Sequence, residues 1–500
     1  MKQKRQLFFI ILLTITFYLA FLSEATSLIR IGAFVAYLLL VFCISYALML
    51  ENRSPYKTLL WIYLIVFVPV FGYAFFIYSG QLQVRGHLFQ RKRKSNQMYL
   101  KQVSKKNSFD SWISMDGDEK FISNMIAKES KFPINFSSDT TVLKDGEETF
   151  AAIKNQLIHA KQYIHLEYYT LRDDQIGMEI INILVNKSML GLEVKVIYDG
   201  VGSASLSKGV IRKLKAAGVE IACFLPLKSG LFNQKINFRN HRKIIVVDGE
   251  IAFVGGLNIG DEYLSRDSKI GFWRDTHVKL KGEAIRSLHT IFLGDWTYLT
   301  NEVLDIKTYP TQPLNKNDLG GVQVLGSGPD ANQGIMSELY FNMIVSAKRS
   351  LWIATPYFVP NKDIRTALSM AAKKGIDVKL MVPAINDGFL TQYATRSYFG
   401  ELLDNGIDVY LYQKGFMHQK IMIVDGQFAT TGTANVDFRS LNLNFEVNVF
   451  LFHTKSVTNL VENFTEDIRH CRKVESETYH NRGFIVQSKE SLARLFSPVL

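Results

Sequence analysis

The sequence has few cysteines and no framework built from them. Three occur in 500 residues, Cys43, Cys223 and Cys471, and they lie far apart, which excludes a disulfide scaffold and paired metal-ligand spacing. Charge is also modest, at 21% of residues against 47% that are hydrophobic. That balance excludes a disordered chain, because disorder needs low hydrophobicity and a high charge fraction. A chain of this length is expected to form two or three structural units.

Acidic residues are nearly absent from the first fifth of the chain. Residues 1–106 contain 14 Lys and Arg but only two acids, Glu24 and Glu51, so this segment carries the whole net charge of +12. The remaining residues hold equal numbers of acids and bases. A nucleic-acid-binding domain would carry the basic excess itself. The position of the positive charge in residues 1–106 therefore argues against nucleic acid as a partner. It indicates that the charge has a role in that segment.

Three long runs without any charge lie in the same first fifth of the chain. They cover Leu7–Leu22, Ile31–Leu50 and Leu59–Tyr78. Because a helix of 20 residues spans about 30 Å, the thickness of a bilayer's hydrocarbon core, the second and third runs are predicted to be transmembrane helices. The first resembles the apolar region of a signal peptide but lacks a convincing cleavage site, so we interpret it as a retained span or an interfacial segment. Residues 1–80 are therefore predicted to be a membrane-spanning segment of two or three helices.

A basic stretch, residues 81–106, is predicted to be a juxtamembrane linker. Its basic residues are Arg85, Arg91, Lys92, Arg93, Lys94, Lys101, Lys105 and Lys106. Two roles remain open: an anchor that keeps the following domain in the cytoplasm, or binding of anionic lipid headgroups at about 1 kcal/mol per basic residue. We expect a multi-pass protein of the cell membrane with its large C-terminal domain in the cytoplasm.

The rest of the chain alternates between strand and helix patterns, and the pattern occurs twice. The predicted strand–helix–strand units are Tyr163–Leu171, Met178–Leu190 and Leu192–Tyr198 in one half, and Leu351–Val359, Ile364–Lys374 and Val378–Val382 in the other. This internal duplication predicts an α/β fold. We place the first half at 107–315 and the second at 316–500, with Lys307–Asn332 as a linker or long loop between them.

Each half carries the same signature, His-x-Lys-x4-Asp. It comprises His241, Lys243 and Asp248 in the first half and His418, Lys420 and Asp425 in the second. His and Lys two positions apart leave an extended strand on the same face. Each Asp precedes a glycine between two apolar runs, which is the signal of a two-residue hairpin turn, so each Asp also has an interpretation as a turn residue.

Two His–Lys pairs suit reactions at a phosphate diester. The lysine ammonium groups can hold its anionic oxygens and stabilise charge in the transition state. One neutral histidine can attack phosphorus to form a phosphohistidine, while the other, protonated, donates to the leaving alkoxide and later accepts a proton from the incoming hydroxyl. No metal or other cofactor is required. Each histidine also needs an acceptor for its other ring nitrogen, and the candidates are Asp275 and Glu446.

The paired signatures resemble the HKD motifs of the phospholipase D superfamily, and the chain is most similar to its bacterial cardiolipin synthases. The supporting runs are Glu51–Arg53, Phe253–Tyr263, Thr355–Pro360, Gly432–Asn435 with Arg439 and Ser440, and Ser497–Leu500. The resemblance implies a duplicated phospholipase D-type α-β-α sandwich behind an N-terminal transmembrane segment, usually of two spans. It further implies that the six signature residues form one site between the halves, and that Asn258 and Asn435 touch phosphate.

The resemblance implies transfer of a phosphatidyl group from one phosphatidylglycerol to another, giving cardiolipin and glycerol, with His241 as nucleophile and His418 as acid and base. The near symmetry of the two halves leaves that assignment open. A second hypothesis is a membrane-bound hydrolase of the same superfamily, with water as acceptor. A third is a lipid-binding scaffold without activity, which two intact His–Lys pairs argue against. The sequence does not distinguish water from an alcohol as acceptor.

Overall fold

The protein divides into two compact units, one ending at Leu88 and the other beginning at Phe89. The structure, a computed structural model, describes residues 2–50, 55–79, 88–103, 115–226, 237–267, 271–314, 320–331 and 334–497. The run Glu51–Arg53 and the last three residues of the chain lie outside this range, as do Arg85, Lys105 and Lys106.

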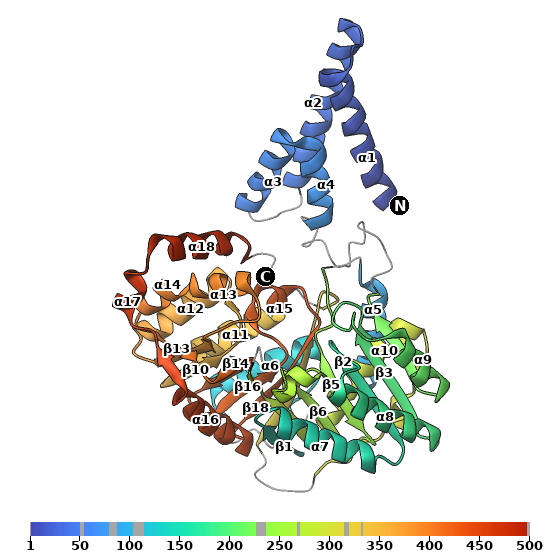
Figure 1. Cartoon of the computed structure of the whole chain (residues 1–500), viewed down its shortest axis with the longest axis vertical. Coiled ribbons are helices and arrows are strands. Elements are labelled where there is room, and N and C mark those ends of the chain that lie inside the picture. The colour runs from blue at the N-terminus through green and yellow to red at the C-terminus, as the bar shows by residue number, and fades with distance from the viewer. Residues whose placement is uncertain are drawn as a thin grey trace. The chain divides into compact units, whose positions relative to one another are not determined.

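All secondary-structure elements of the N-terminal unit are helices where the unit is described (Figure 1). Helix α1 (Lys2–Phe17) continues into a short π-helical turn, η1 (Tyr18–Leu22), and is followed by α2 (Ser27–Met49). In the described part of the chain, α2 is the one helix both long and apolar enough to cross a membrane, with 23 residues and a mean hydropathy of 2.3. It corresponds to the second of the apolar runs.

The third apolar run does not form a single helix, which corrects the prediction of one span over Leu59–Tyr78. It is broken at Val68 into α3 (Pro55–Phe67) and α4 (Pro69–Ser79). The two helices fold back on each other, since the rings of Trp61 and Phe76 lie 5.3 Å apart. Pro69 disrupts the helix because it has no amide N–H. Gly72 permits the close approach, because a Cβ there would lie 2.4 Å from the Leu64 carbonyl oxygen.

The second unit is built on two mixed β-sheets with the same strand order. The first sheet runs β1-β8-β6-β5-β2-β3-β4. Its strands are β1 (Ser138–Leu143), β2 (Tyr163–Tyr168), β3 (Glu193–Asp199), β4 (Glu220–Phe224), β5 (Lys243–Val247), β6 (Ile251–Gly255) and β8 (His277–Gly282). Strands β2, β3 and β4 are parallel, and β5 lies antiparallel to β2.

The second sheet repeats this order as β9-β18-β16-β15-β10-β12-β13 and adds β19 at one edge. Its strands are β9 (Gly321–Ser327), β10 (Ser350–Ala354), β12 (Asp377–Pro383), β13 (Asp408–Tyr412), β15 (Ile421–Val424), β16 (Phe428–Gly432), β18 (Glu446–Phe452) and β19 (Cys471–Lys473). Figure 1 shows the two sheets side by side, each flanked by helices. The duplicated α/β architecture is therefore confirmed.

Helices cover the sheets in matching positions. In the first half these are α7 (Gly146–His159), α8 (Gln175–Met189), α9 (Lys208–Ala216) and α10 (Ile285–Thr300); in the second they include α11 (Ile335–Ser346), α12 (Lys362–Lys373) and α16 (Lys455–Ile468). One helix packs on the opposite half. Helix α6 (Gly117–Ser130) lies within the range assigned to the first half, 107–315, yet its Ile122 and Ile126 belong to the core of the second.

Two segments predicted to be linkers contain ordered elements. Within Lys307–Asn332, residues Gly321–Ser327 form β9, which pairs antiparallel with β18 along its whole length. Within 81–106, residues Gln90–Val103 form helix α5, which packs against α10 in the second unit. Arg93 donates a hydrogen bond of 2.9 Å to the Asp330 carbonyl. Part of the basic stretch is thus used inside this unit.

Candidate active site

The two halves meet through short strands that lead directly into the site. Strand β14 (Gly415–Met417) pairs in parallel with β7 (Phe272–Arg274), and the His418 N–H donates 2.7 Å to the Arg274 carbonyl. An equivalent contact holds His241. Its backbone N–H donates a hydrogen bond of 2.9 Å to the carbonyl of Phe445 in the second half. Each histidine is thus anchored by the backbone of the opposite half.

The carboxylates that hold the two histidines are exchanged between the halves. His241 Nδ1 lies 2.9 Å from Glu446 Oε2, and His418 Nδ1 lies 2.7 Å from Asp275 Oδ2. Both carboxylates are fully buried. Gly256 makes room for Asp275, because a Cβ on Gly256 would lie 2.0 Å from the aspartate Oδ1. This arrangement leaves the Nε2 atom of each ring for a substrate.

The two lysines lie beside the histidines at the starts of β5 and β15. Lys243 Nζ donates 2.8 Å to the His241 carbonyl, and Lys420 Nζ donates 2.6 Å to the His418 carbonyl. The lysines interact electrostatically with each other and with both buried carboxylates. Four residues from two sheets therefore form one cluster, in which each ammonium group keeps further N–H donors for an anion.

Burial dominates the ionisation of this cluster. It lowers the pKa of Lys243 to about 7 and that of Lys420 to about 8. Burial, assisted by Lys420, lowers the pKa of His418 to about 3, and burial also lowers the pKa of His241. An anion bound between these groups would favour their protonated forms and raise all four values. The cluster is therefore suited to a phosphate.

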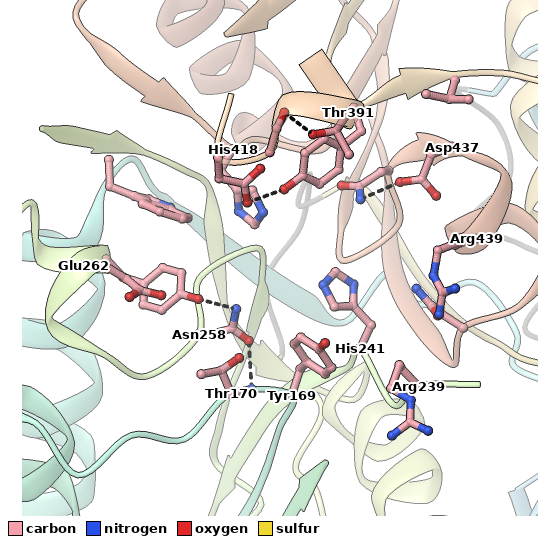
Figure 2. A pocket seen from close by; sticks show the side chains of 18 of the residues that line it. Tyr169, Thr170, Arg239, His241, Asn258, Glu262, Thr391, His418, Asp437 and Arg439 are labelled. Atoms are coloured by element: carbon pink, nitrogen blue, oxygen red, sulfur yellow. Dashed lines mark hydrogen bonds between the residues drawn. The ribbon is translucent and has the colours of Figure 1, made fainter. Parts of the chain in front are cut away.

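A cavity of about 650 Å³ opens onto both histidines (Figure 2). Asn258 and Asn435 line it as well. Asn258 Nδ2 donates 2.9 Å to the Tyr263 hydroxyl, while its Oδ1 accepts from the Thr170 N–H at 3.2 Å. Asn435 Nδ2 donates 2.8 Å to Asp437 Oδ2. The structure thus brings eight of the ten residues predicted from the sequence to one site.

The structure does not bring Asp248 and Asp425 to the cavity. Each aspartate directly follows a strand, β5 or β15, at the end away from the lysine. For Asp248 this places the residue about 16 Å along β5 from Lys243. The Asp248 carboxylate accepts backbone N–H groups of residues 161–163 at 2.7, 2.8 and 2.9 Å. The Asp425 carboxylate does the same for residues 348–350, at 3.0, 2.7 and 2.9 Å. Neither residue lines the cavity.

Both aspartates are turn residues with left-handed backbones. Asp248 and Asp425 each have φ of 55°, and the glycine after each has φ of 68°, as a type I′ turn requires. The hairpins are nevertheless one residue longer than predicted. Val247 pairs with Ile251, and Val424 pairs with Phe428, so three residues separate the strands in each case.

Several cavity residues were not selected from the sequence, chiefly the arginines. Arg239, Arg439 and Arg172 all line the cavity. A signal for Arg239 was present, because it stands two positions before His241 and side chains at alternate positions of an extended segment share a face. Arg439 was named only in a run that supports the family resemblance, and no comparable spacing marked Arg172. Tyr169, whose ring lies 5.1 Å from that of His241, was missed for the same reason.

A buried charge network stabilises the segment that carries His241. Arg242 forms an ion pair with Asp295 on α10 and donates to the carbonyls of Ser327 at 3.0 Å and Glu446 at 3.2 Å. Lys92 of α5 forms a second ion pair with Asp295. The side chains of Lys92 and Asp295 are completely buried. The network therefore joins α5, both halves and the backbone of Glu446, whose side chain pairs with His241.

Comparison with known proteins agrees with this geometry. A family model described as "Cardiolipin synthase, PLD-like domain" matches residues 153–296 and 340–468. A protein of Bacillus subtilis named probable cardiolipin synthase YwiE is 47% identical over 502 residues, covering all of both chains. The cardiolipin synthase of Halalkalibacterium halodurans is 46% identical and covers 98% of this chain and 99% of its own.

A solved structure supports the fold. The phosphatidylserine synthase of Haemophilus influenzae has a TM-score of 0.58 and 15% identity, and the match covers 76% of this chain and all of the other. Two sheets of the same order, with a His–Lys pair from each at their junction, define an enzyme of the phospholipase D superfamily. Within that superfamily the chain belongs to the cardiolipin synthases.

Proposed function

We propose that the protein transfers a phosphatidyl group from one phosphatidylglycerol to a second, giving cardiolipin and glycerol through a phosphatidyl-histidine. The observation that supports this proposal best is the crossed pairing of two histidines with two buried carboxylates above one cavity. This geometry supplies two imidazoles with fixed orientation, one for attack and one for proton transfer.

In the first step, Nε2 of one neutral histidine attacks phosphorus. A P–N bond forms and the P–O bond to the glycerol headgroup breaks, while the other histidine, as imidazolium, gives its proton to the departing glycerol oxygen. Lys243 and Lys420 hold the non-bridging oxygens, whose charge grows in the transition state. The amide groups of Asn258 and Asn435 add hydrogen bonds to the same phosphate.

In the second step, the free hydroxyl of another phosphatidylglycerol attacks the phosphatidyl-histidine. The histidine that lost its proton now removes one from this hydroxyl, the new P–O bond forms and the P–N bond breaks. Both histidines return to their starting protonation states. The buried carboxylates stabilise whichever imidazole is positively charged.

The substrate is a membrane lipid, and the N-terminal unit fits that role. We propose that α2 crosses the bilayer and that the remaining apolar helices of the unit also lie within it, with the catalytic unit on the cytoplasmic side. The support is the length and hydropathy of α2 and the basic residues that follow this unit in the sequence.

Purified full-length protein in phosphatidylglycerol vesicles tests the proposal. We expect cardiolipin and glycerol in equal amounts, and a protein-bound phosphatidyl group that acid releases by breaking its P–N bond. Peptide mapping of the trapped group identifies the nucleophile as His241 or His418. Phosphatidic acid without cardiolipin would show a hydrolase instead, and would overturn the proposed transfer.

A further inference from the structure

Two arginines from opposite halves meet at the His241 end of the cavity. Arg439 Nη2 donates a hydrogen bond of 2.7 Å to the carbonyl of Asn237, two residues before Arg239. Arg239 is 6% exposed, and both arginines line the cavity. Figure 2 shows them on the same side of the site, beyond His241 as seen from His418. The two guanidinium groups thus concentrate N–H donors for an anion at this end of the cavity.

The opposite end has a different chemistry, although the two halves share one fold. Arg239 stands two residues before His241, and the residue in the same place before His418 is Phe416. The Phe416 ring lies 5.5 Å from the His418 ring. The near symmetry of the scaffold therefore does not extend to the side chains next to the two histidines.

The second arginine shows the same contrast. Arg439 stands four residues after Asn435, and the residue four after Asn258 is Glu262. Glu262 is paired with Arg172 at 2.8 Å, so this end carries a neutralised ion pair. An anion that enters the cavity is therefore attracted to the end with Arg239 and Arg439.

The carboxylates near these two arginines are already engaged by other donors. Asp199, 3.4 Å from Arg239 Nη1, accepts the backbone N–H groups of Val201 at 2.8 Å, Asn240 at 2.9 Å and Gly202 at 3.1 Å. Asp437 accepts from the Ser440 N–H at 2.7 Å and from Asn435. Their charge is thus shared with the backbone, and the cavity side of the arginine pair remains attractive to an anion.

We propose that Arg239 and Arg439 bind the phosphate of the second lipid, the acceptor phosphatidylglycerol, and later the second phosphate of the product. This inference rests on the proposed transfer reaction. Cardiolipin contains two phosphates joined by a three-carbon bridge, and only one of them can lie between Lys243 and Lys420. A second phosphate site one glycerol away is therefore required, and paired guanidinium groups provide the planar donors that phosphate prefers.

Such a subsite explains how an enzyme surrounded by water selects an alcohol acceptor. Binding the acceptor through its own charge holds its hydroxyl near the phosphatidyl-histidine and raises its effective concentration. Neutral acceptors, including water and ethanol, gain nothing from the arginines. Loss of the arginines should therefore penalise phosphatidylglycerol as acceptor but leave neutral acceptors unaffected.

An internal competition tests this subsite. Full-length protein is incubated with phosphatidylglycerol vesicles and ethanol, and cardiolipin, phosphatidylethanol and phosphatidic acid are measured in one sample. For Arg439→Gln and Arg239→Gln we expect the ratio of cardiolipin to the two other products to fall by about tenfold or more, the value of a charge-assisted hydrogen bond. Because it is a ratio, the result does not depend on the fraction of folded protein.

Matched variants complete the test. Arg439→Lys, which keeps the charge, should restore part of the ratio, and Arg172→Gln at the opposite end should leave the ratio at the wild-type value. An equal fall of all products in Arg439→Gln and Arg239→Gln would overturn the subsite, since the arginines would then act on the donor. A wild-type enzyme that makes phosphatidylethanol but no cardiolipin would instead refute the proposed function itself.

Discussion

Glu446 Oε2 lies 2.9 Å from His241 Nδ1, although the two residues are 205 positions apart and belong to different halves of the chain. The mirror contact joins Asp275 and His418 at 2.7 Å. Burial acts to raise the pKa of Glu446, but His241 and Lys243 outweigh it and hold the value below its usual range. The carboxylate is therefore charged and orients and stabilises the imidazole beside it.

Replacing either carboxylate by its amide should impair catalysis much more than folding. For Glu446→Gln and Asp275→Asn we expect kcat to fall by at least about a hundredfold, because the imidazolium loses its counter-charge and its fixed tautomer. Cardiolipin formation and thermal melting are measured on each variant. Glu262→Gln is the matched control, since Glu262 lines the same cavity but pairs with Arg172. Full activity in Glu446→Gln would contradict this role.

Asp248 should prove structural. Asp248→Ala removes the acceptor of three backbone N–H groups and should cost about 1–3 kcal/mol of stability, seen as a lower midpoint in chemical denaturation. At a temperature where the variant is folded, kcat should stay within a few-fold of wild type. His241→Ala provides the opposite pattern, with activity lost and the midpoint nearly unchanged. A hundredfold loss of kcat in folded Asp248→Ala would place this aspartate in the chemistry after all.

Helix α5 should behave as part of the catalytic unit and not as a tether. Lys92→Met removes one of the two cations that compensate buried Asp295 and should cost about 3–5 kcal/mol. Lys101→Met changes an exposed lysine on the same helix and should have little effect. The midpoints of chemical denaturation are measured for both variants and for the wild type. Equal midpoints would mean that the buried pair contributes nothing to stability.

Lys243 should destabilise the folded protein at neutral pH, although catalysis requires it. Burial lowers its folded pKa from 10.5 to about 7, so between these values the unfolded chain binds a proton that the folded chain does not. The free energy of unfolding therefore rises as the pH increases from about 7 to 10.5. Below pH 7, buried Lys243 is protonated in the folded protein and destabilises it by the full amount. Lys243→Met should be inactive and should melt above wild type, most clearly below pH 7, with the gap closing toward pH 10.5.

A lysine outside the site is the control for this pH dependence. Lys281 is exposed on β8, and Lys281→Met should show no comparable gap at any pH. Thermal melts of both variants and wild type from pH 6 to 10 provide the measurement. A gap for Lys243→Met that grows with pH would reverse the expected sign and refute the penalty.

Local sequence patterns were sufficient to predict the repeated sheets and the two His–Lys pairs. An apolar run of strand length is recognised from a few neighbouring positions. The same is true of a histidine and a lysine two positions apart, which share one face of a strand. The crossed pairing of Glu446 with His241 depends on how the halves associate, and no local pattern encodes that. The same holds for α6, whose Ile122 and Ile126 pack in the core of the second half.

Two wrong predictions have identifiable causes. Strand β9 was assigned to a linker because Pro, Gly, Asn and Asp surround it, and its partner β18 lies more than a hundred residues further along the chain. The single span over Leu59–Tyr78 was predicted from hydropathy alone. Hydropathy does not register the break that Pro69 causes or the close packing that Gly72 permits.

The exchange of carboxylates makes each half of the catalytic unit incomplete by itself. The first half holds His241 and Lys243 but not Glu446, and the second holds His418 and Lys420 but not Asp275. Neither half could therefore orient its own histidine without the other. Two identical halves would give two identical ends of the site, whereas this chain places Arg239 before one histidine and Phe416 before the other.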